Sequence, residues 1–318
     1  MEAKRTLIAA LCGCGVIAQP MLRAEEGGSG HYLPGSMSSF VDAVPLQPTF
    51  IARYNMLQYS GAVSAGVPLP IAGLDTVGAE ATSWAHGLSL VWRPPINLGD
   101  RWSYAASATV PFVWLDVTAN VRAGTRSVQR TSSINGLGDI VVMPLMLNYN
   151  VSSNFNVNFR TGVYAPTGDY EVGRLANTGK NFWTVEPTLG LMYFGVKNGI
   201  EASLFLGSDF NSENKDTSYK SGTQFHLDGT LAQHFPLFGG LAGVGANGYW
   251  YRQVTGDSGD GATFGDFEGR TAGLGPVISY AHKIGKVDLL AELKWLHEVE
   301  TKNRLQGDYV WLKVVFKF

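Results

Sequence analysis

The final ten residues, 309–318, constrain the fold most, because apolar side chains occupy every second position. One face of this segment carries Val310, Leu312, Val314, Phe316 and Phe318, and the other carries Tyr309, Lys313 and Lys317. A strand with lipid on one side and a watery interior on the other must alternate in this way. An edge strand of a soluble sheet is the alternative interpretation.

The first 24 residues have the pattern of a secretory signal peptide. Lys4 and Arg5 precede an apolar run over residues 7–18, which is shorter than the roughly 20 residues that a membrane-spanning helix needs. We therefore expect cleavage after Ala24, with a retained membrane anchor as the alternative. Cys12 and Cys14 both lie in this leader, so the mature chain would have no thiol, no disulfide and no cysteine metal site.

The composition favours a barrel that spans a membrane. Only 16% of the 318 residues are charged, against about 25% in soluble domains. No apolar segment outside the leader is long enough for a membrane helix, and only helices and closed barrels satisfy the backbone in lipid. The formal charge of −2 gives no basic excess, so nucleic acid is not an expected partner.

The alternation predicts an all-β fold, a transmembrane antiparallel β-barrel of about twelve strands over residues 48–318. The expected strands are 48–60, 82–92, 101–116, 137–149, 154–166, 182–194, 199–211, 221–234, 240–252, 268–281, 286–299 and 307–318. Connections after even strands are short. Connections after odd strands are longer, such as 61–81 and 117–136, although 301–306 is short. Outer-membrane barrels have short periplasmic turns and long outer loops, so we expect both termini in the periplasm.

Charged and polar side chains share one face of most expected strands, and they must line the lumen because charges facing hydrocarbon are costly. The candidates are Arg53, Arg160, Glu186, Glu201, Asp209, His226, Asp228, Asp288, Glu292 and Lys294. Since Arg160 and Glu186 lie on sequential strands, we expect a cross-strand network that contains both. Its role is either to stabilise the barrel or to recognise a ligand.

Residues 25–47 contain a glycine run, a proline and aromatic residues, and cannot form a membrane strand. We expect this segment to enter the lumen as a plug, with His31, Tyr32 and Leu33 as candidates for ligand contact. A disordered periplasmic leader is the alternative, because glycine-rich termini are often mobile.

The chain lacks the common catalytic and metal motifs. G-x-S-x-G, H-E-x-x-H and the P-loop are absent. His226 and Asp228 share a strand face without a serine beside them, so we interpret them as part of a lumenal hydrogen-bond network. The run 256–261 is rich in glycine and aspartate but lacks the EF-hand spacing, and a solvated turn is favoured over a calcium site. We expect no enzyme activity, no cofactor and no metal.

Six segments carry a resemblance to a family of outer-membrane proteins described as transporters or as involved in the meta-pathway of phenol degradation. They are 28–35 (GSGHYLPG), 166–170 (PTGDY), 177–183, 211–228, 253–259 and 273–276. The resemblance covers nearly the whole mature chain. It implies a barrel in the Gram-negative outer membrane that takes up small hydrophobic or aromatic compounds.

The end of the chain also resembles the sorting signal of bacterial outer-membrane barrels, carried here by Phe316 and Phe318. This resemblance implies outer-membrane lipid and the barrel-assembly machinery as partners. Two other functions stay open at this point. One is a structural barrel with a closed lumen, and the other is a barrel enzyme acting on envelope lipids.

Overall fold

The structure is a computed structural model that describes residues 28–124, 126–262 and 268–318. The predicted signal peptide, 1–24, lies outside the described residues, as do Cys12 and Cys14. No helix within the described ranges is long and apolar enough to cross a membrane.

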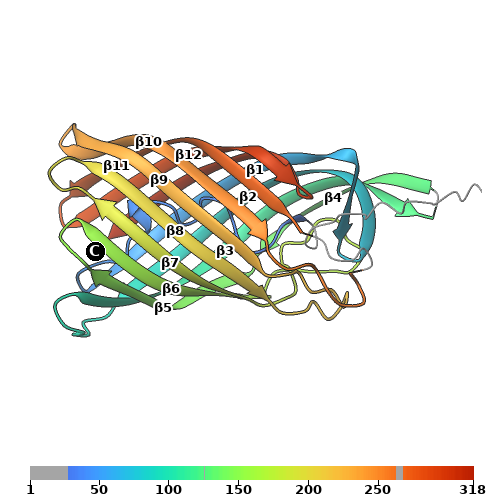
Figure 1. Ribbon diagram of the computed structural model, residues 1–318, viewed down its shortest axis with the longest axis horizontal. Coiled ribbons are helices and arrows are strands. Elements are labelled where there is room, and N and C mark those ends of the chain that lie inside the picture. Colours follow the sequence, from blue (N-terminus) through green and yellow to red (C-terminus); the bar gives the residue numbers. More distant parts are fainter. Residues whose placement is uncertain (1–27, 125, 263–267) are drawn as a thin grey trace, which may run out of the picture.

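Antiparallel strands close into a barrel, as Figure 1 shows from the side. They are β1 (Thr49–Ile71), β2 (Leu74–Arg93), β3 (Trp102–Ala123), β4 (Arg126–Leu137), β5 (Ile140–Asn150), β6 (Phe155–Ala165), β7 (Thr184–Phe194), β8 (Ile200–Asn211), β9 (Gln224–Leu237), β10 (Gly240–Gln253), β11 (Arg270–Ile284), β12 (Val287–Lys302) and β13 (Gln306–Lys317). Strands β1 and β13 pair and close the ring. Both β4 and β5 pair with β3, so they are two halves of one strand interrupted at Gly138 and Asp139. The predicted barrel of about twelve strands is confirmed.

Side chains alternate between the lumen and the outer surface along the strands. In β3, Val110, Phe112 and Trp114 are exposed, whereas Val113 and Leu115 border an internal cavity. In β13, Phe316 is exposed and Trp311 is buried. An outer surface with apolar residues at alternate positions is what lipid requires, because lipid-facing and lumen-facing residues alternate in membrane barrels.

One end of the barrel has the short turns that the sequence predicts. They are 94–101, 151–154, 195–199, 238–239 and 285–286, and the opposite end has the loops 166–183 and 212–223 and the described loop residues 254–262. Two predicted loops are wrong, because 61–81 and 117–136 are mostly strand. Paired strands continue past the membrane as ribbons, since β1 has 23 residues and a tilted spanning strand needs only about 9–11.

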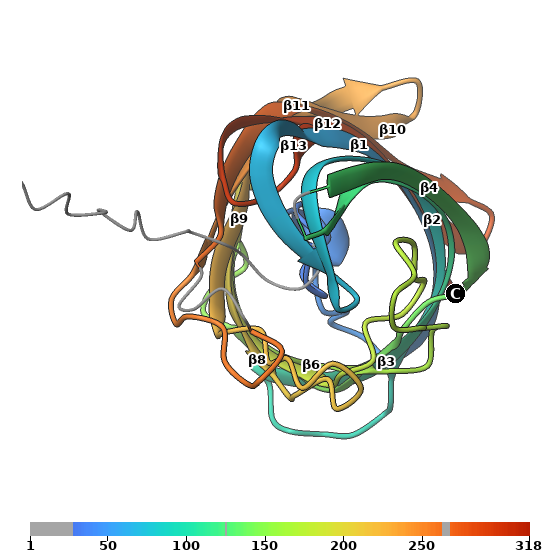
Figure 2. The same ribbon diagram turned by 90° about the vertical axis from the view of Figure 1, so that its right-hand side faces the viewer.

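The ribbon of β1 and β2 ends in a tight turn and bends over the barrel opening (Figure 2). Ala72 and Gly73 have φ of 47° and 78°, and positive φ at both central residues is the requirement of a type I′ hairpin. Leu69 and Ile71 next to this turn pack against Leu175 of the loop 166–183. The opening at this end is therefore partly covered by apolar contacts.

Residues 28–48, which precede β1, lie inside the ring of strands, where Figure 2 shows them in blue. At one end Gly28 lies near Leu69 of β1, close to the long-loop end. At the other end Thr49 begins β1, and its hydroxyl donates a hydrogen bond to the carbonyl oxygen of Phe318. We call residues 28–48 the N-terminal segment.

Candidate functional site in the barrel lumen

Asp42 attaches the N-terminal segment to the barrel wall. The segment forms a single 3-10 turn, Phe40–Asp42, which leaves the Asp42 carboxylate fully buried. Lys313 Nζ lies 2.8 Å from both carboxylate oxygens, and Arg53 Nη1 lies 3.1 Å from Oδ1. Burial alone would raise the pKa of Asp42, but the positive charges of Lys313 and Arg53 outweigh it and hold the pKa below its usual range. Asp42 is therefore held as a carboxylate between two cations.

Asp228 of β9 holds the middle of the N-terminal segment. The hydroxyl of Tyr32 donates to Oδ2 at 2.8 Å, and the backbone N–H of Gly35 donates to Oδ1 at 2.7 Å. Gly35 has a φ of 79°, and an added Cβ would lie 2.8 Å from a methyl carbon of Leu296. Only glycine fits this backbone conformation next to the wall, which explains its place in the motif at 28–35.

Asp139 links the N-terminal segment to the interruption between β4 and β5. Its Oδ2 lies 2.9 Å from Nε2 of His31 and accepts a backbone hydrogen bond from Lys180 at 2.7 Å. Its Oδ1 accepts another from Gly168 at 2.9 Å. Burial would raise the pKa of Asp139, but these hydrogen bonds, led by that of His31, lower it below its usual value. One carboxylate thus fixes the segment, the broken strand and the loop 166–183.

The lumen has two chemically different walls. The N-terminal segment binds polar groups on β6, β9, β12 and β13. Opposite it, β2 and β3 present small and apolar side chains to a cavity of about 400 Å³. This lining includes Ala81, Ala85, Val113, Leu115 and Val117. The segment therefore covers much of the polar wall and leaves beside it a mainly apolar cavity, which Arg53, Arg160, Lys180 and Arg304 also border.

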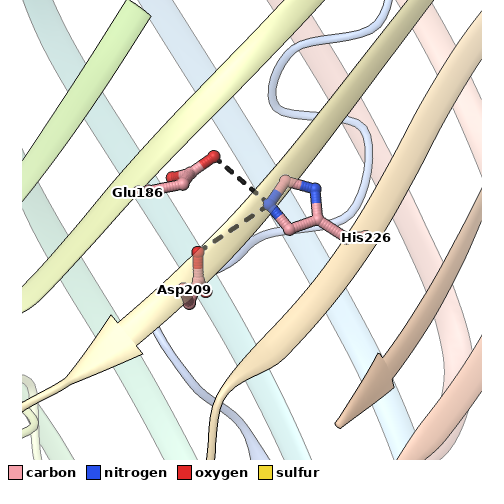
Figure 3. Close-up of side chains that lie close together, drawn as sticks. All are labelled: Glu186, Asp209 and His226. Atoms are coloured by element: carbon pink, nitrogen blue, oxygen red, sulfur yellow. Dashed lines mark ion pairs between the residues drawn. The ribbon is translucent and has the colours of Figure 1, made fainter. Parts of the chain in front are cut away.

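Four ionisable side chains meet on the polar wall under Tyr32. Figure 3 shows Glu186, Asp209 and His226 on three neighbouring strands, β7, β8 and β9. His226 Nε2 lies 3.3 Å from Glu186 Oε1 and 3.8 Å from Asp209 Oδ1, while Nδ1 lies 3.4 Å from Asp228 Oδ2. The ring of Tyr32 stacks on the His226 ring with 3.9 Å between centroids. The cluster is thus shielded from the lumen by the N-terminal segment.

Eight of the ten candidate lumen residues are buried. They are Arg160, Glu186, Glu201, Asp209, His226, Asp228, Glu292 and Lys294. Arg53 has a side chain 14% exposed and binds Asp42. Asp288 is 39% exposed near the end of its strand and lies 3.6 Å from Lys317. Asp288 is therefore a solvated residue at the rim of the barrel.

Arg160 and Glu186, for which a cross-strand network containing both is expected, have different partners in the structure. Arg160 donates to the backbone oxygen of Asp42 at 2.8 Å and to Asn158 at 3.0 Å. Glu186 accepts from Tyr164 at 2.5 Å and lies beside His226. The register of β6 and β7 explains why these two side chains have separate partners, because Arg160 lies opposite Thr188 and Glu186 lies opposite Gly162.

The three candidates in the N-terminal segment have different surroundings. His31 and Tyr32 are buried against Asp139 and Asp228. Leu33 is 40% exposed and lies along the cavity. Of the three, Leu33 is the one whose side chain is open to a ligand.

Sequence reasoning missed Asp42, Asp139 and Lys313 as site residues. Lys313 was on the predicted polar face of the last strand, so its alternate position along that strand could have identified it as a lumen-facing residue. Asp42 and Asp139 lie outside regular strands, where periodicity carries no information. Their role depends on partners about 100 to 270 residues away along the chain.

A solved structure shares this architecture. The COG4313 outer membrane channel from Pseudomonas putida F1 superposes with a TM-score of 0.62 at 16% identity, covering 90% of this chain and 100% of that chain. The beta domain of the Bordetella autotransporter Brka gives a TM-score of 0.46 at 10% identity, covering 86% and 99%. No curated protein matches the chain.

A closed antiparallel barrel with an apolar outer surface and charged residues inside is an outer-membrane β-barrel. A family model described as "Putative MetA-pathway of phenol degradation" matches residues 65–314. The chain belongs to this family, as its sequence motifs indicated.

Proposed function

We propose that this protein is an outer-membrane channel through which small hydrophobic or aromatic compounds pass passively, with the N-terminal segment as a plug that restricts the lumen. The observation that carries the proposal is the apolar cavity between the segment and the wall formed by β2 and β3. Its volume of about 400 Å³ lies within the range of small-molecule sites, about 300–1,000 Å³.

The distribution of polar groups supports a hydrophobic solute over an ion or a sugar. Most charged side chains inside the barrel are buried and bonded to the N-terminal segment or to each other, and those that reach the cavity lining, such as Arg53, Arg160 and Lys180, also bond to that segment. The free surface beside the segment consists of residues such as Leu33, Val113 and Leu115. Transfer of apolar surface from water to such a lining is favourable, at about 25 cal/mol per Å².

Two positions on one strand allow a matched test. Val113→Trp places a large side chain in the cavity, and Val110→Trp places the same side chain on the outer surface, where Val110 is 46% exposed. Reconstituted in liposomes, the Val113→Trp barrel should take up toluene and phenol severalfold more slowly than the wild type, and the Val110→Trp barrel at the wild-type rate. Equal uptake by all three barrels would contradict the route.

The same liposomes separate the competing functions. A barrel that assembles normally but passes no aromatic solute would be a structural barrel with a closed lumen. Release of fatty acid or sugar from envelope lipid in the same assay would identify an enzyme. Toluene uptake that saturates and depends on residue 113 supports the channel.

A further inference from the structure

The cluster under Tyr32 combines ligand types that bind a transition-metal ion. Glu186, Asp209 and His226 come from adjacent strands and are at most 2% exposed. Gly207 lies directly opposite His226 in the pairing of β8 and β9, and a Cβ at Gly207 would overlap the imidazole ring. The glycine thus lets the ring lie flat over β8, between the two carboxylates.

The spacing of these groups differs from that of the other buried histidine pairs in the lumen. His234 Nε2 lies 2.8 Å from Glu201, and His31 Nε2 lies 2.9 Å from Asp139, which are ordinary charge-assisted hydrogen bonds. His226 Nε2 lies 3.3 and 3.8 Å from its two carboxylates. Within the described part of the chain, neither ring nitrogen of the buried His226 has a hydrogen-bond partner.

This wider spacing is close to that of ligands around one cation. Nitrogen and oxygen ligands lie about 2.0–2.2 Å from Zn²⁺, so two tetrahedral ligands are about 3.3–3.5 Å apart. The distance from His226 Nε2 to Glu186 Oε1 falls in this range, and the distance from His226 Nε2 to Asp209 Oδ1 exceeds it by a few tenths of an ångström. All three ligand atoms lie within 4.8 Å of one another.

The surrounding residues match the outer shell of a metal site. A metal-bound histidine usually donates its other ring N–H to a carboxylate, which fixes its tautomer. Here Asp228 Oδ2 lies 3.4 Å from His226 Nδ1. The hydroxyls of Tyr164 and Thr188 donate to Glu186 at 2.5 and 3.2 Å, which orients that carboxylate.

The charges of the cluster also favour a cation. Three carboxylates surround a single imidazole in a fully buried region, and buried charges are normally paired or bound to metal. We propose that Glu186, Asp209 and His226 form a binding site for one divalent transition-metal ion of the Zn²⁺ class. The ion would balance the charges of Glu186 and Asp209 while His226 is neutral and keeps its proton on Nδ1.

Such an ion would connect the barrel wall to the N-terminal segment. It would tie β7, β8 and β9 together, and it would fix the His226 ring on which Tyr32 stacks at 3.9 Å. The Tyr32 hydroxyl binds Asp228, which also orients His226. Metal binding should therefore order residues near Tyr32 as well as the wall.

Metal binding can be measured on the intact purified barrel without any transport assay. After treatment with a chelator and dialysis, the wild-type protein should bind one equivalent of Zn²⁺ by calorimetry. It should also bind one equivalent of Co²⁺ with the visible absorption of a low-coordinate nitrogen and oxygen site. His226→Gln should lose this binding, and Asp228→Asn, which keeps all three ligands, should weaken it about 10–100-fold.

His234→Gln is the matched control, because it removes a buried histidine with a carboxylate partner from the same strand. It should keep the full Zn²⁺ stoichiometry and the Co²⁺ spectrum. A folded, chelated wild-type barrel that binds no more Zn²⁺ than His226→Gln would overturn the proposal and leave His226 as an imidazolium held by carboxylates. Neither result decides the channel proposal, which is tested separately by solute uptake.

Discussion

At the scale of single residues, the polar side chains of the lumen act as attachment points for the N-terminal segment. Parity along a strand is fixed by its geometry, so the sequence could assign strand residues to one face or the other, and eight of the ten candidates are buried. It did not predict their partners, since Asp42 and Asp139 lie outside the strands and meet Lys313 and His31 only through the closed barrel. The face of the strand on which a residue lies was therefore predictable from the sequence, and the side chain with which it pairs was not.

Asp42→Asn should release the N-terminal segment. The substitution removes the nearest counter-ion of Lys313, whose side chain is 1% exposed, and leaves it with Glu292 at 3.8 Å. Breaking a buried ion pair costs about 3–5 kcal/mol. Hydrogen exchange of residues 28–45 should become faster, with the barrel strands still protected. Asp288→Asn is the control, because its exposed pair contributes about 0–1 kcal/mol. Equal exchange in both variants would show that Asp42 is not the anchor.

Acidification should loosen the same attachment. Because the folded state lowers the pKa of Asp42, its stabilising effect is complete above the ordinary aspartate value of about 3.9 and is lost as the pH falls below it. The protection factors of residues 38–42, which correct for the intrinsic pH dependence of amide exchange, should thus fall between pH 5 and pH 3, about one unit either side of that pKa. Asp42→Asn should show a smaller change over this interval. A pH response that is the same in both proteins would assign the effect to other groups.

At the scale of elements, the strands were predicted within a few residues and their extensions were not. Alternation within the membrane is forced by lipid on one side, so it marks 48–60 and 307–318 clearly. Outside the membrane no lipid faces the strand, so apolar and polar residues need not alternate. The ribbons at 61–81 and 117–136 depend on strand pairing and tight turns instead. The interruption at Gly138 and Asp139 likewise has no periodic signal.

Deletion of Phe318 should impair assembly. Its backbone N–H donates to the carbonyl oxygen of Phe50 at 3.1 Å and its carbonyl accepts from Thr49, next to the pairing of β1 and β13 that closes the ring. Cell fractionation should find the shortened chain in the periplasm or degraded. Phe238→Ala, which changes a phenylalanine that is 88% exposed in a turn, should assemble normally. Heat-modifiable barrel in the outer membrane after the deletion would refute a sorting role.

The two ends of the barrel should lie on opposite sides of the membrane. Short turns lie at one end, and the loop 212–223 and loop residues 254–262 lie at the other, which predicts that the latter are outside the cell. Epitope tags near Asn214 or Gly259 should bind antibody on intact cells. Tags near Asn97 or Gly285 should bind only after the outer membrane is opened, and the reverse pattern would contradict the topology.

At the scale of the whole molecule, the barrel holds a strand-free segment against its polar wall and leaves an apolar cavity on the other side. The sequence motifs indicated the family, and periodicity indicated the barrel. The position of the cavity depends on where the segment lies, which no local pattern encodes. We propose that this segment restricts a channel for hydrophobic compounds.

The most direct test is single-channel conductance in planar bilayers after removal of residues 28–39, compared with a chain in which the same residues are replaced by a Gly-Ser sequence of equal length. A plug predicts a clear rise in conductance for the deletion, a smaller rise for the Gly-Ser chain, and faster uptake of phenol and toluene. Unchanged conductance and uptake in correctly assembled deletion barrels would contradict the account.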